Sequence, residues 1–325
     1  MIFTAASAAL TFALAGCGES GSSGTSAPPT AATGGCAGVA GDSLVVLTDD
    51  KKLQNADNIV ALINTKGSSP ALVAAVDKVA AALDTTKLIA LNKAVDIDRK
   101  TPQVAAAEFA TAAGFATGLS GGSGAVKIGA ANFSESQTLA ELYKIALTAA
   151  GFKATVQTAG NRELYEAALE RGELTVFPEY AATITEFLNQ KANGKTAAPK
   201  ASGDIDATIT ALKELGGKVG LTVGTPSAAA DQNAFAVTKA FAEKNGVKTL
   251  SDFAAKCSGK ASILAGPAEC PQRPFCQLGL KDKYGIEFGS FQQADAGGPQ
   301  TKTALTTGAA ALGLVFSSDG GLATL

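Results

Sequence analysis

Residues 126–177 alternate between short apolar runs and longer amphipathic ones, VKIGAANFSESQTLAELYKIALTAAGFKATVQTAGNRELYEAALERGELTVF. The apolar runs of strand length lie at 126–129, 154–158 and 174–177. Between them, apolar residues recur at helical spacing in two runs that begin at Ser134 and Glu163. Ser134 and Gln137 also predict a capping box at the first helix. Strands that alternate with helices predict an α/β sheet covered by helices, which is the fold class that we expect.

The same pattern continues on both sides of this stretch. Ser69 before Pro70, and Thr101 before Pro102, predict two helix starts. A hydroxyl side chain caps the first turn of a helix, and proline fits the first helical position. Further strands are expected at 219–223, 234–237, 261–264 and 311–316, with the second of them at a sheet edge.

The composition argues against several classes of function. The 325-residue chain has 27 basic and 29 acidic side chains, and its net charge of -2 does not favour nucleic-acid binding. It contains no histidine, which excludes hydrolases with an imidazole base and histidine-ligated zinc. An exported enzyme would need a base such as Glu179 or Asp319, and no nucleophile is paired with either. We therefore expect no catalytic residues, no cofactor and no metal.

The N-terminal residues have the character of an export signal. Residues 1–16 are uncharged and mostly apolar, and Leu14-Ala15-Gly16 before Cys17 resembles a bacterial lipobox. We expect Cys17 to carry a lipid, and residues 17–36, rich in Gly, Ser, Thr and Ala, to form a flexible tether. The protein is then expected on the extracytoplasmic face of a bacterial cell membrane, attached by its lipid.

The remaining cysteines are even in number. They are Cys36, Cys257, Cys270 and Cys276. An even set in an exported protein indicates two possible disulfides, and the sequence leaves all three pairings open.

Three separated motifs resemble those of a known family: IGAANFSESQ at 128–137, PEY at 178–180 and QRP at 272–274. The family comprises substrate-binding proteins of osmoprotectant ABC importers, whose solutes are glycine betaine, choline, carnitine and proline betaine. The likeness covers residues 125–325. It implies a two-lobed α/β fold of the type II periplasmic-binding-protein kind, with a cleft between the lobes that closes around the solute.

The order of the segments differs from that of the family. Segments that the family has at its C-terminal end stand at the front here, at 44–50, 58–62 and 91–114. The chain therefore resembles a circular permutant in which a Gly- and Ser-rich linker at 117–124 joins the family's usual ends. The resemblance implies one lobe at 56–222, which contains this linker, and a second lobe made of 37–55 and 223–325.

The resemblance also implies a set of ligand contacts. Betaine binders of this family hold the quaternary ammonium between aromatic rings by cation-π attraction, and they hold the carboxylate with polar donors. Tyr180 and Phe316 match two of the ring positions. Thr183 matches a polar position one turn after Tyr180, and Arg273 matches the arginine that binds the carboxylate.

Two other ring positions are replaced in this chain. Asn233 and Asp57 stand where the family often has tyrosine. Asp57 would offer a countercharge to a cation and Asn233 a hydrogen bond, so a polyol, an amine or a hydroxylated aromatic suits them as well as betaine does. Asn132 and Gln137, in the first motif, complete the expected contacts.

These features together predict a lipid-anchored, monomeric solute-binding protein without catalytic activity. It would capture a small osmolyte-like solute of the glycine betaine or choline type and deliver it to an ABC permease with its ATPase. The alternative is the same fold with a different polar ligand, acting as an importer component or as a sensor that presents its loaded surface to a partner protein.

Overall fold

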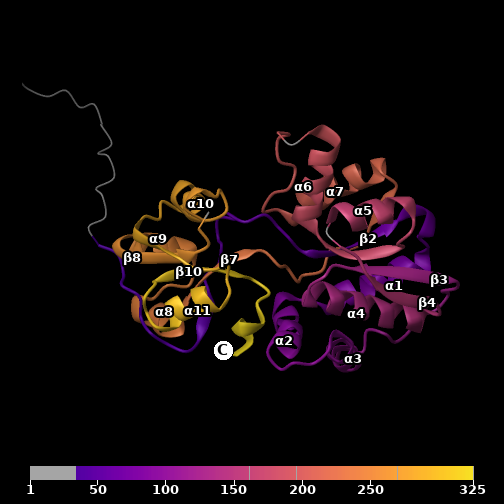
Figure 1. The fold of residues 1–325 in the computed structure, drawn as a ribbon, viewed down its shortest axis with the longest axis horizontal. Coiled ribbons are helices and arrows are strands. Elements are labelled where there is room, and N and C mark those ends of the chain that lie inside the picture. Colours follow the sequence, from indigo (N-terminus) through magenta and orange to yellow (C-terminus); the bar gives the residue numbers. More distant parts are fainter. Residues whose placement is uncertain (1–33, 161, 195, 269, 325) are drawn as a thin grey trace, which may run out of the picture. The chain divides into compact units, whose positions relative to one another are not determined.

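The computed structural model describes residues 34–160, 162–194, 196–268 and 270–324. The predicted signal peptide at 1–16, Cys17 and most of the predicted tether lie outside the described residues. The described chain forms two five-stranded sheets with helices packed on them (Figure 1). In this described part, no helix combines the length and apolar character needed to cross a bilayer.

The first sheet has the strand order β4-β3-β5-β2-β6. Its strands are β2 (Ile59–Asn64), β3 (Ala125–Ala130), β4 (Lys153–Thr158), β5 (Val176–Tyr180) and β6 (Leu221–Val223). β3 runs parallel to β4 and β5, whereas β2 is antiparallel to β5 and β6. Every residue of β2 is buried, and alternate side chains enter different cores, Ile59 and Ala61 one core and Val60 the other.

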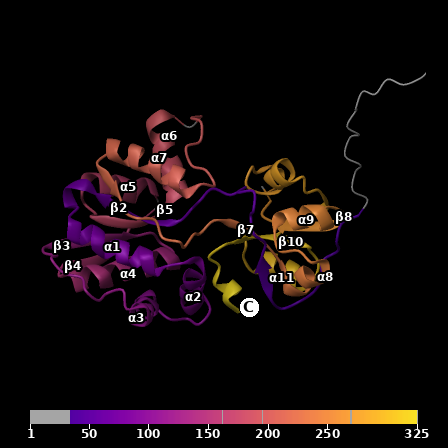
Figure 2. The ribbon, with the colours of Figure 1, turned by 180° about the vertical axis from the view of Figure 1, so that it is seen from behind.

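Helices cover both faces of this sheet. They are α1 (Pro70–Ala82), α2 (Thr85–Asp96), α3 (Pro102–Ala113), α4 (Ser134–Ala150), α5 (Arg162–Arg171), α6 (Ala181–Asn193) and α7 (Ile205–Lys218), with a 3-10 turn η1 (Thr65–Gly67). Buried residues of α1 to α4 share one core, and those of α5 to α7 share the other. Figures 1 and 2 both show α1 and α4 beside β3 and β4.

Two predicted helix starts are confirmed, and one predicted helix cap does not form. The side chains of Ser69 and Thr101 accept hydrogen bonds from the third backbone N–H of α1 and α3. The capping box predicted at α4 does not form, because Ser134 is already the first helical residue and Phe133 occupies the cap without a side-chain bond. The hydroxyl of Ser136 instead accepts a bond from Ala131 N at 2.9 Å, which holds the loop before the helix.

The second sheet has the strand order β1-β7-β10-β8-β9. Its strands are β1 (Leu44–Val46), β7 (Asn233–Thr238), β8 (Gly259–Gly266), β9 (Phe288–Gln293) and β10 (Leu312–Phe316). The prediction of an edge strand at 234–237 was wrong, because β7 pairs with β10 on one side and with β1 on the other. β1 comes from a segment almost two hundred residues earlier, which a local pattern does not reveal.

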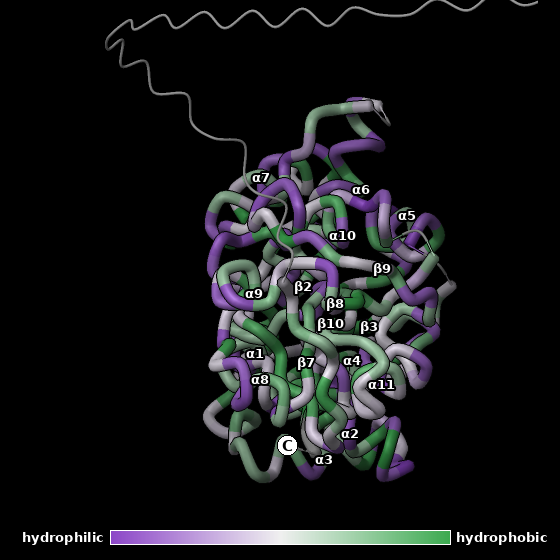
Figure 3. Tube along the Cα trace, turned by 90° about the vertical axis from the view of Figure 1, so that its left-hand side faces the viewer, coloured by the Kyte–Doolittle hydropathy of each residue, from purple (hydrophilic) through white to green (hydrophobic). Residues whose placement is uncertain are grey.

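The helices of the second sheet are short. They are α8 (Lys239–Asn245), α9 (Leu250–Cys257), α10 (Gln277–Gly279) and α11 (Pro299–Thr306), with the turns η2 (Cys270–Gln272), η3 (Leu280–Tyr284) and η4 (Gly320–Thr324). Figure 3 shows hydrophobic residues gathered along strands such as β7, and hydrophilic ones on surface helices such as α5 and α6. α8 and α9 share a core with β7 and β8.

Two segments connect the sheets, 47–58 after β1 and 224–232 after β6. They lie side by side, because the backbone N of Asp231 donates to the carbonyl of Asp57 at 3.1 Å. The end of β10 joins them, since Ser317 N donates to the Gln232 carbonyl at 2.8 Å. Three stretches far apart in sequence therefore meet between the two sheets.

The predicted linker at 117–124 is attached to the turn between α4 and β4. Gly122 N donates to the Ala150 carbonyl at 2.8 Å, and Lys153 N donates to the Gly124 carbonyl at 2.8 Å. A Cβ on Gly122 would lie 2.5 Å from the ring of Phe152, so this position needs glycine. The segment thus has a fixed place on the molecule, unlike the loose linker that its composition suggests.

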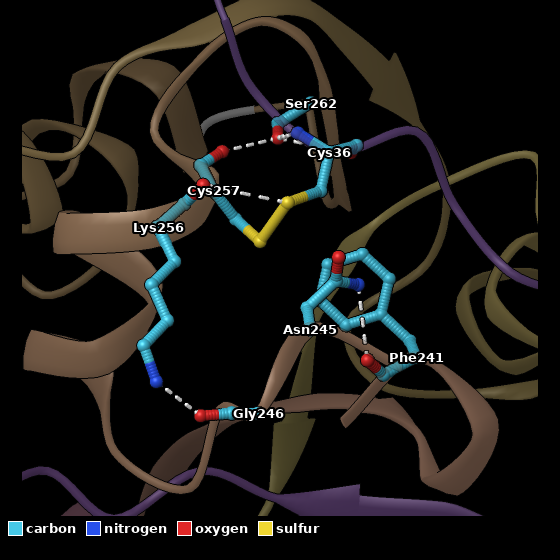
Figure 4. The surroundings of a disulfide bond; sticks show 7 residues. All are labelled: Cys36, Phe241, Asn245, Gly246, Lys256, Cys257 and Ser262. Atoms are coloured by element: carbon cyan, nitrogen blue, oxygen red, sulfur yellow. Dashed lines mark hydrogen bonds between the residues drawn. A yellow bond between two sulfur atoms is a disulfide. The ribbon is translucent and has the colours of Figure 1, made fainter. Parts of the chain in front are cut away.

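Disulfides join Cys36 to Cys257 and Cys270 to Cys276. Figure 4 shows the first, with the Ser262 hydroxyl between the two backbones, where it accepts a bond from Cys36 N at 2.9 Å. Ala261 N also donates to the Gly34 carbonyl at 3.2 Å. The last residues of the predicted tether, 34–36, therefore lie against β8.

The two disulfides are expected to differ in their effect on stability. The Cys36–Cys257 bond closes a loop of 221 residues and the Cys270–Cys276 bond one of 6. In the chain-entropy model the longer loop restricts the unfolded chain more, so Cys36→Ser with Cys257→Ser should lower the free energy of unfolding by about 2 to 5 kcal/mol. Urea unfolding of both double variants measures this, and an equal or larger loss from the short loop would contradict it.

Candidate functional site

A cavity of about 580 Å³, the main cavity, lies where the connecting segments meet the ends of strands. Tyr180 ends β5, Asn233 begins β7 and Phe316 ends β10, directly opposite Asn233 in the ladder. The lining residues are Gln54, Asn55, Asp57, Arg162, Tyr180, Ala182, Thr183, Glu186, Phe187, Gln190, Asp231, Gln232, Asn233, Phe275 and Phe316.

Two smaller cavities share residues with the main cavity. The second cavity, of about 430 Å³, shares Asp231 and Phe316 with it and also includes Glu135. The third cavity, of about 400 Å³, shares Asn233, Phe275 and Phe316 with it and also includes Arg273. Phe316 borders all three, so the three cavities are neighbours.

One face of α6 forms a wall of the main cavity. Thr183, Glu186, Phe187 and Gln190 line it, and their spacing of three, four and seven residues places them on one side of a helix. This spacing was available in the sequence as a signal, and it would have added Phe187 to the expected contacts.

Four aromatic rings border the main cavity, Tyr180, Phe187, Phe275 and Phe316. Tyr180 and Phe316 are expected from the sequence, whereas Phe187 and Phe275 are not. Tyr180 also stacks on Phe133, with ring centroids 6.3 Å apart. Phe187 and Phe275 therefore add two rings to the wall of the main cavity.

The hydroxyl of Tyr180 is bound within a buried polar network. It donates to Glu135 Oε1 at 2.6 Å. Asn92 donates to the other oxygen of Glu135 and, at 2.8 Å, to the carbonyl of Ser318. Burial raises the pKa of Glu135 to about 7, with the nearby charge of Asp231 as the next cause. Glu135 and Asn92 were not among the contacts expected from the sequence, although Glu135 lies inside the first motif.

Stability is expected to fall as pH rises through this pKa. Folding raises the pKa of Glu135 from its ordinary 4.5 to about 7, so between these values the folded protein keeps a proton that the unfolded chain has released. The favourable contribution is therefore complete below pH 4.5 and is lost as pH approaches 7. Burial also raises the pKa of Asp57, to about 6. Its ionisation therefore lowers stability over the same rise in pH.

The free energy of unfolding, measured by urea at several pH values, should decrease by about 1 to 3 kcal/mol between pH 4.5 and 7.5. Glu135→Gln should remove part of this decrease, because the amide does not ionise, whereas the part that Asp57 contributes should remain. Glu163→Gln, which removes an exposed carboxylate from α5, controls for the loss of one charge. A decrease of the same size in Glu135→Gln would show that other groups cause it.

A buried ion pair holds the backbone next to Tyr180. Arg162 donates to both oxygens of Glu179, at 3.0 and 3.1 Å. Glu179 also accepts from the Tyr165 hydroxyl at 2.7 Å and from Tyr180 N at 3.0 Å, and its side chain is 0% exposed. Arg162, at the start of α5, presents one side to the main cavity, while its charge is matched by Glu179.

Asp57 contacts the first turn of α6. Its carboxylate accepts from Thr183 N at 2.9 Å and from the Thr183 hydroxyl. The carboxylate therefore compensates the unpaired N–H groups at the start of that helix. Two of the expected contacts, Asp57 and Thr183, thus bind each other at the edge of the main cavity.

Arg273 lies in the third cavity, on the loop that Cys270 and Cys276 close. Its side chain is exposed, and among the described residues no carboxylate lies within ion-pair distance of it. Within the described part of the chain, no acidic group therefore competes with an anionic group of a ligand for this guanidinium. Asn132 and Gln137 are placed differently, since neither is among the residues that line the three cavities.

The described residues contain no group of three or more acidic, histidine or cysteine side chains arranged to hold a metal ion. The charged groups of the main cavity are mostly acidic. Asp57, Glu186 and Asp231 line it, and Arg162, the one basic side chain among its described lining residues, is neutralised by Glu179. A cation fits this region better than an anion does.

Comparisons with known proteins give the following matches. A family model described as the substrate-binding domain of an ABC-type glycine betaine transport system matches residues 37–112 and 124–325. No curated protein matches the sequence. A solved glycine betaine/carnitine/choline ABC transporter is 24% identical, with a TM-score of 0.46, over 61% of this chain and 71% of that chain.

Two further solved structures are more distant. A putative peptide-binding protein AppA from Clostridium difficile is 10% identical, with a TM-score of 0.28, over 61% of this chain and 48% of that one. OppA from Haemophilus influenzae, in complex with a peptide, is 13% identical, with a TM-score of 0.23, over 57% and 45%.

Proposed function

Because the chain belongs to the family of substrate-binding domains of ABC-type glycine betaine transport systems, we propose that it is a lipid-anchored solute receptor of such an importer. It has the family's two-lobed, periplasmic-binding-protein-like α/β fold and is a non-catalytic component. On the extracytoplasmic face of a bacterial membrane it captures a small ammonium solute of the glycine betaine or choline type. It then delivers this solute to an ABC permease with its ATPase.

The observation that carries this proposal is the main cavity with its four aromatic rings and its acidic side chains. The faces of Tyr180, Phe187, Phe275 and Phe316 attract a cation that has no hydrogen-bond donor. The carboxylates of Asp57 and Asp231 add a negative potential at the same place. The ammonium group of the solute therefore binds in the main cavity.

A carboxylate on the solute, as in glycine betaine, extends toward the third cavity. Arg273 there has no carboxylate partner among the described residues, and Asn233 and Phe316 border both cavities. The distribution of charge, with acids in one cavity and a free arginine in the next, suits a zwitterion. Choline, which has a hydroxyl in place of the carboxylate, would use Asn233 instead.

We also propose that the chain is a circular permutant. The family model matches in two segments that end and resume around the Gly- and Ser-rich linker at 117–124. One lobe is residues 56–222 and the other is 37–55 with 223–325. A chain rebuilt to begin at 125, with 325 joined to 34 so that the Cys36–Cys257 bond is kept, and with its end near 114, should bind the same solute with equal affinity. A rebuilt chain that folds but does not bind would contradict this part.

In this proposal the lipid anchor is connected through the chain to the lobe that contains the Cys36–Cys257 bond. Cys17 carries the lipid after residues 1–16 are removed, and residues 17–36 lead to the folded part. When the full chain is expressed in a bacterium, Cys17→Ala should shift the protein from the membrane fraction to the soluble fraction. Retention of this variant at the membrane would argue against the anchor.

Calorimetric titration of the full chain with glycine betaine, choline, carnitine, proline, polyols and amines tests the ligand class. We expect micromolar binding of at least one ammonium solute and none of uncharged polyols. Phe316→Ala should weaken that binding, whereas Phe109→Ala, a ring of α3 that lines none of the three cavities, should not. Binding of polyols alone would favour the different-ligand alternative, and no binding at all would refute the function.

A further inference from the structure

The loop between Cys270 and Cys276 has its base in a core and its tip at two cavities. Both cysteines are buried, at 0% and 3% exposed, in a core of the second sheet. Between them, Arg273 and Phe275 are exposed and line the third cavity, and Phe275 also lines the main cavity. A cationic group and an aromatic ring of the candidate site therefore belong to one short loop, which the disulfide closes.

The backbone of Arg273 is bonded to both cysteines. Arg273 N donates to the Cys270 carbonyl at 3.2 Å, and Cys276 N donates to the Arg273 carbonyl at 3.0 Å. Both hydrogen bonds end on the two residues that the disulfide joins. The place of the Arg273 backbone therefore depends on the cysteines being held together.

Two further contacts fix the other side of the loop. Gln54, which is 5% exposed in the connecting segment 47–58, donates through Nε2 to the Phe275 carbonyl at 3.0 Å. A Cβ on Gly279 would lie 1.8 Å from the carbonyl oxygen of Pro274, so the loop lies directly against α10. The loop is thus attached to the connecting segment as well as to the core.

We propose that the Cys270–Cys276 disulfide is a positioning element of the solute site, which holds Arg273 at the third cavity and so favours ammonium solutes that carry a carboxylate over choline. The inference rests on the proposed function and adds to it a covalent bond that sets selectivity among the solutes. Gln54 acts in the same way from the other side, through Phe275.

The physical reason is the conformational freedom that a loop loses on binding. An arginine on a mobile loop loses backbone and side-chain freedom when it binds a carboxylate, and this loss lowers the affinity. A loop that is ordered before the solute arrives avoids most of it. The gain is large for glycine betaine, whose carboxylate binds Arg273, and small for choline, which has no anionic group.

Calorimetric titration of the full chain with glycine betaine and choline tests the inference in Cys270→Ser with Cys276→Ser. We expect the affinity for glycine betaine to fall about ten- to a hundredfold and that for choline about threefold or less. Cys36→Ser with Cys257→Ser is the matched control, because neither residue lines the three cavities. It should lower stability and leave the ratio of the two affinities unchanged.

A double-mutant cycle separates positioning from a general loss of structure. In the unchanged protein, Arg273→Gln should weaken the binding of glycine betaine about ten- to a hundredfold. Without the loop disulfide the same change should cost about threefold or less, because the guanidinium is no longer held at the cavity. A disulfide that only supports the fold would leave the two losses additive.

Gln54→Leu opens the second attachment of the loop while the disulfide stays, and it decides the matter if the serine variant does not fold. It should weaken the binding of glycine betaine more than that of choline. Asn55→Leu is its control, since Asn55 also lines the main cavity and, among the described residues, no hydrogen bond joins it to the loop. This control should leave the ratio of the two affinities unchanged.

Equal losses for glycine betaine and choline in the serine variant, or no loss for either, would overturn the inference and leave the proposed function in place. If that variant does not fold, an unchanged ratio in Gln54→Leu has the same meaning. Binding of choline but not of glycine betaine by the unchanged chain would also overturn it, because Arg273 would then hold no carboxylate. Failure of every ammonium solute to bind the unchanged chain would refute the proposed function together with the inference.

Discussion

Tyr180→Ala is expected to weaken binding of an ammonium solute by about ten- to a hundredfold and to lower the free energy of unfolding by about 3 to 5 kcal/mol. The ring is buried at the wall of the main cavity and stacks on Phe133. Its loss removes one face for the cation and leaves Glu135 without its 2.6 Å donor. Both effects follow from one side chain because it belongs to the cavity and to the core.

Two other tyrosine variants separate these effects. Tyr284→Ala removes a comparably buried tyrosine whose hydroxyl also binds a carboxylate, that of Asp49, in the core of the second sheet. It should lose similar stability and keep its affinity. Tyr180→Phe should keep most of the affinity and lose only the bond to Glu135. Calorimetry and urea unfolding measure both quantities, and normal binding by Tyr180→Ala would remove Tyr180 from the site.

Arg162→Ala is expected to lower the free energy of unfolding by about 3 to 5 kcal/mol, because it leaves a fully buried carboxylate without its charge partner. Glu179 has a side-chain exposure of 0% and receives both donors of Arg162. The backbone N of Tyr180 also depends on this carboxylate, so solute affinity should fall as well.

The pair can be replaced as a unit. Arg162→Met with Glu179→Gln removes both charges and should recover much of the stability lost in the single variant. Arg171→Ala breaks an exposed pair with Glu173, whose side chains are 58% and 59% exposed, and should leave the free energy of unfolding nearly unchanged. Equal losses from Arg162→Ala and Arg171→Ala in urea unfolding would contradict the account.

The sequence predicted which helices and strands form better than it predicted which of them lie side by side. Proline and hydroxyl caps gave the starts of α1 and α3, and the strand-helix alternation gave the α/β class, because these signals are local. The place of β7 was missed, since its partner β1 comes from a distant segment. The fixed position of the linker was missed too, because Gly122 is held by backbone bonds and ring contact, which leave no mark in composition.

The candidate site was predicted in part. The expected contacts Tyr180, Thr183 and Phe316 line the main cavity, and Arg273 lies in the adjoining one. Glu135 and Asp231 were not expected, because only the folded chain brings α4 and the segment 224–232 together. Phe187 and its neighbours on α6 did carry a signal, the helical spacing of the residues after the PEY motif.

The central claim is that an acidic, aromatic-lined cavity selects its solute by positive charge. The most direct test compares the affinity for choline with that for 3,3-dimethylbutan-1-ol, its uncharged carbon analogue of the same shape. Calorimetric titration of the full chain should show choline binding at least about tenfold tighter, because only the cation gains from the rings and from Asp231 and Asp57. Equal affinity for the two compounds would contradict the account, since shape alone would then explain binding.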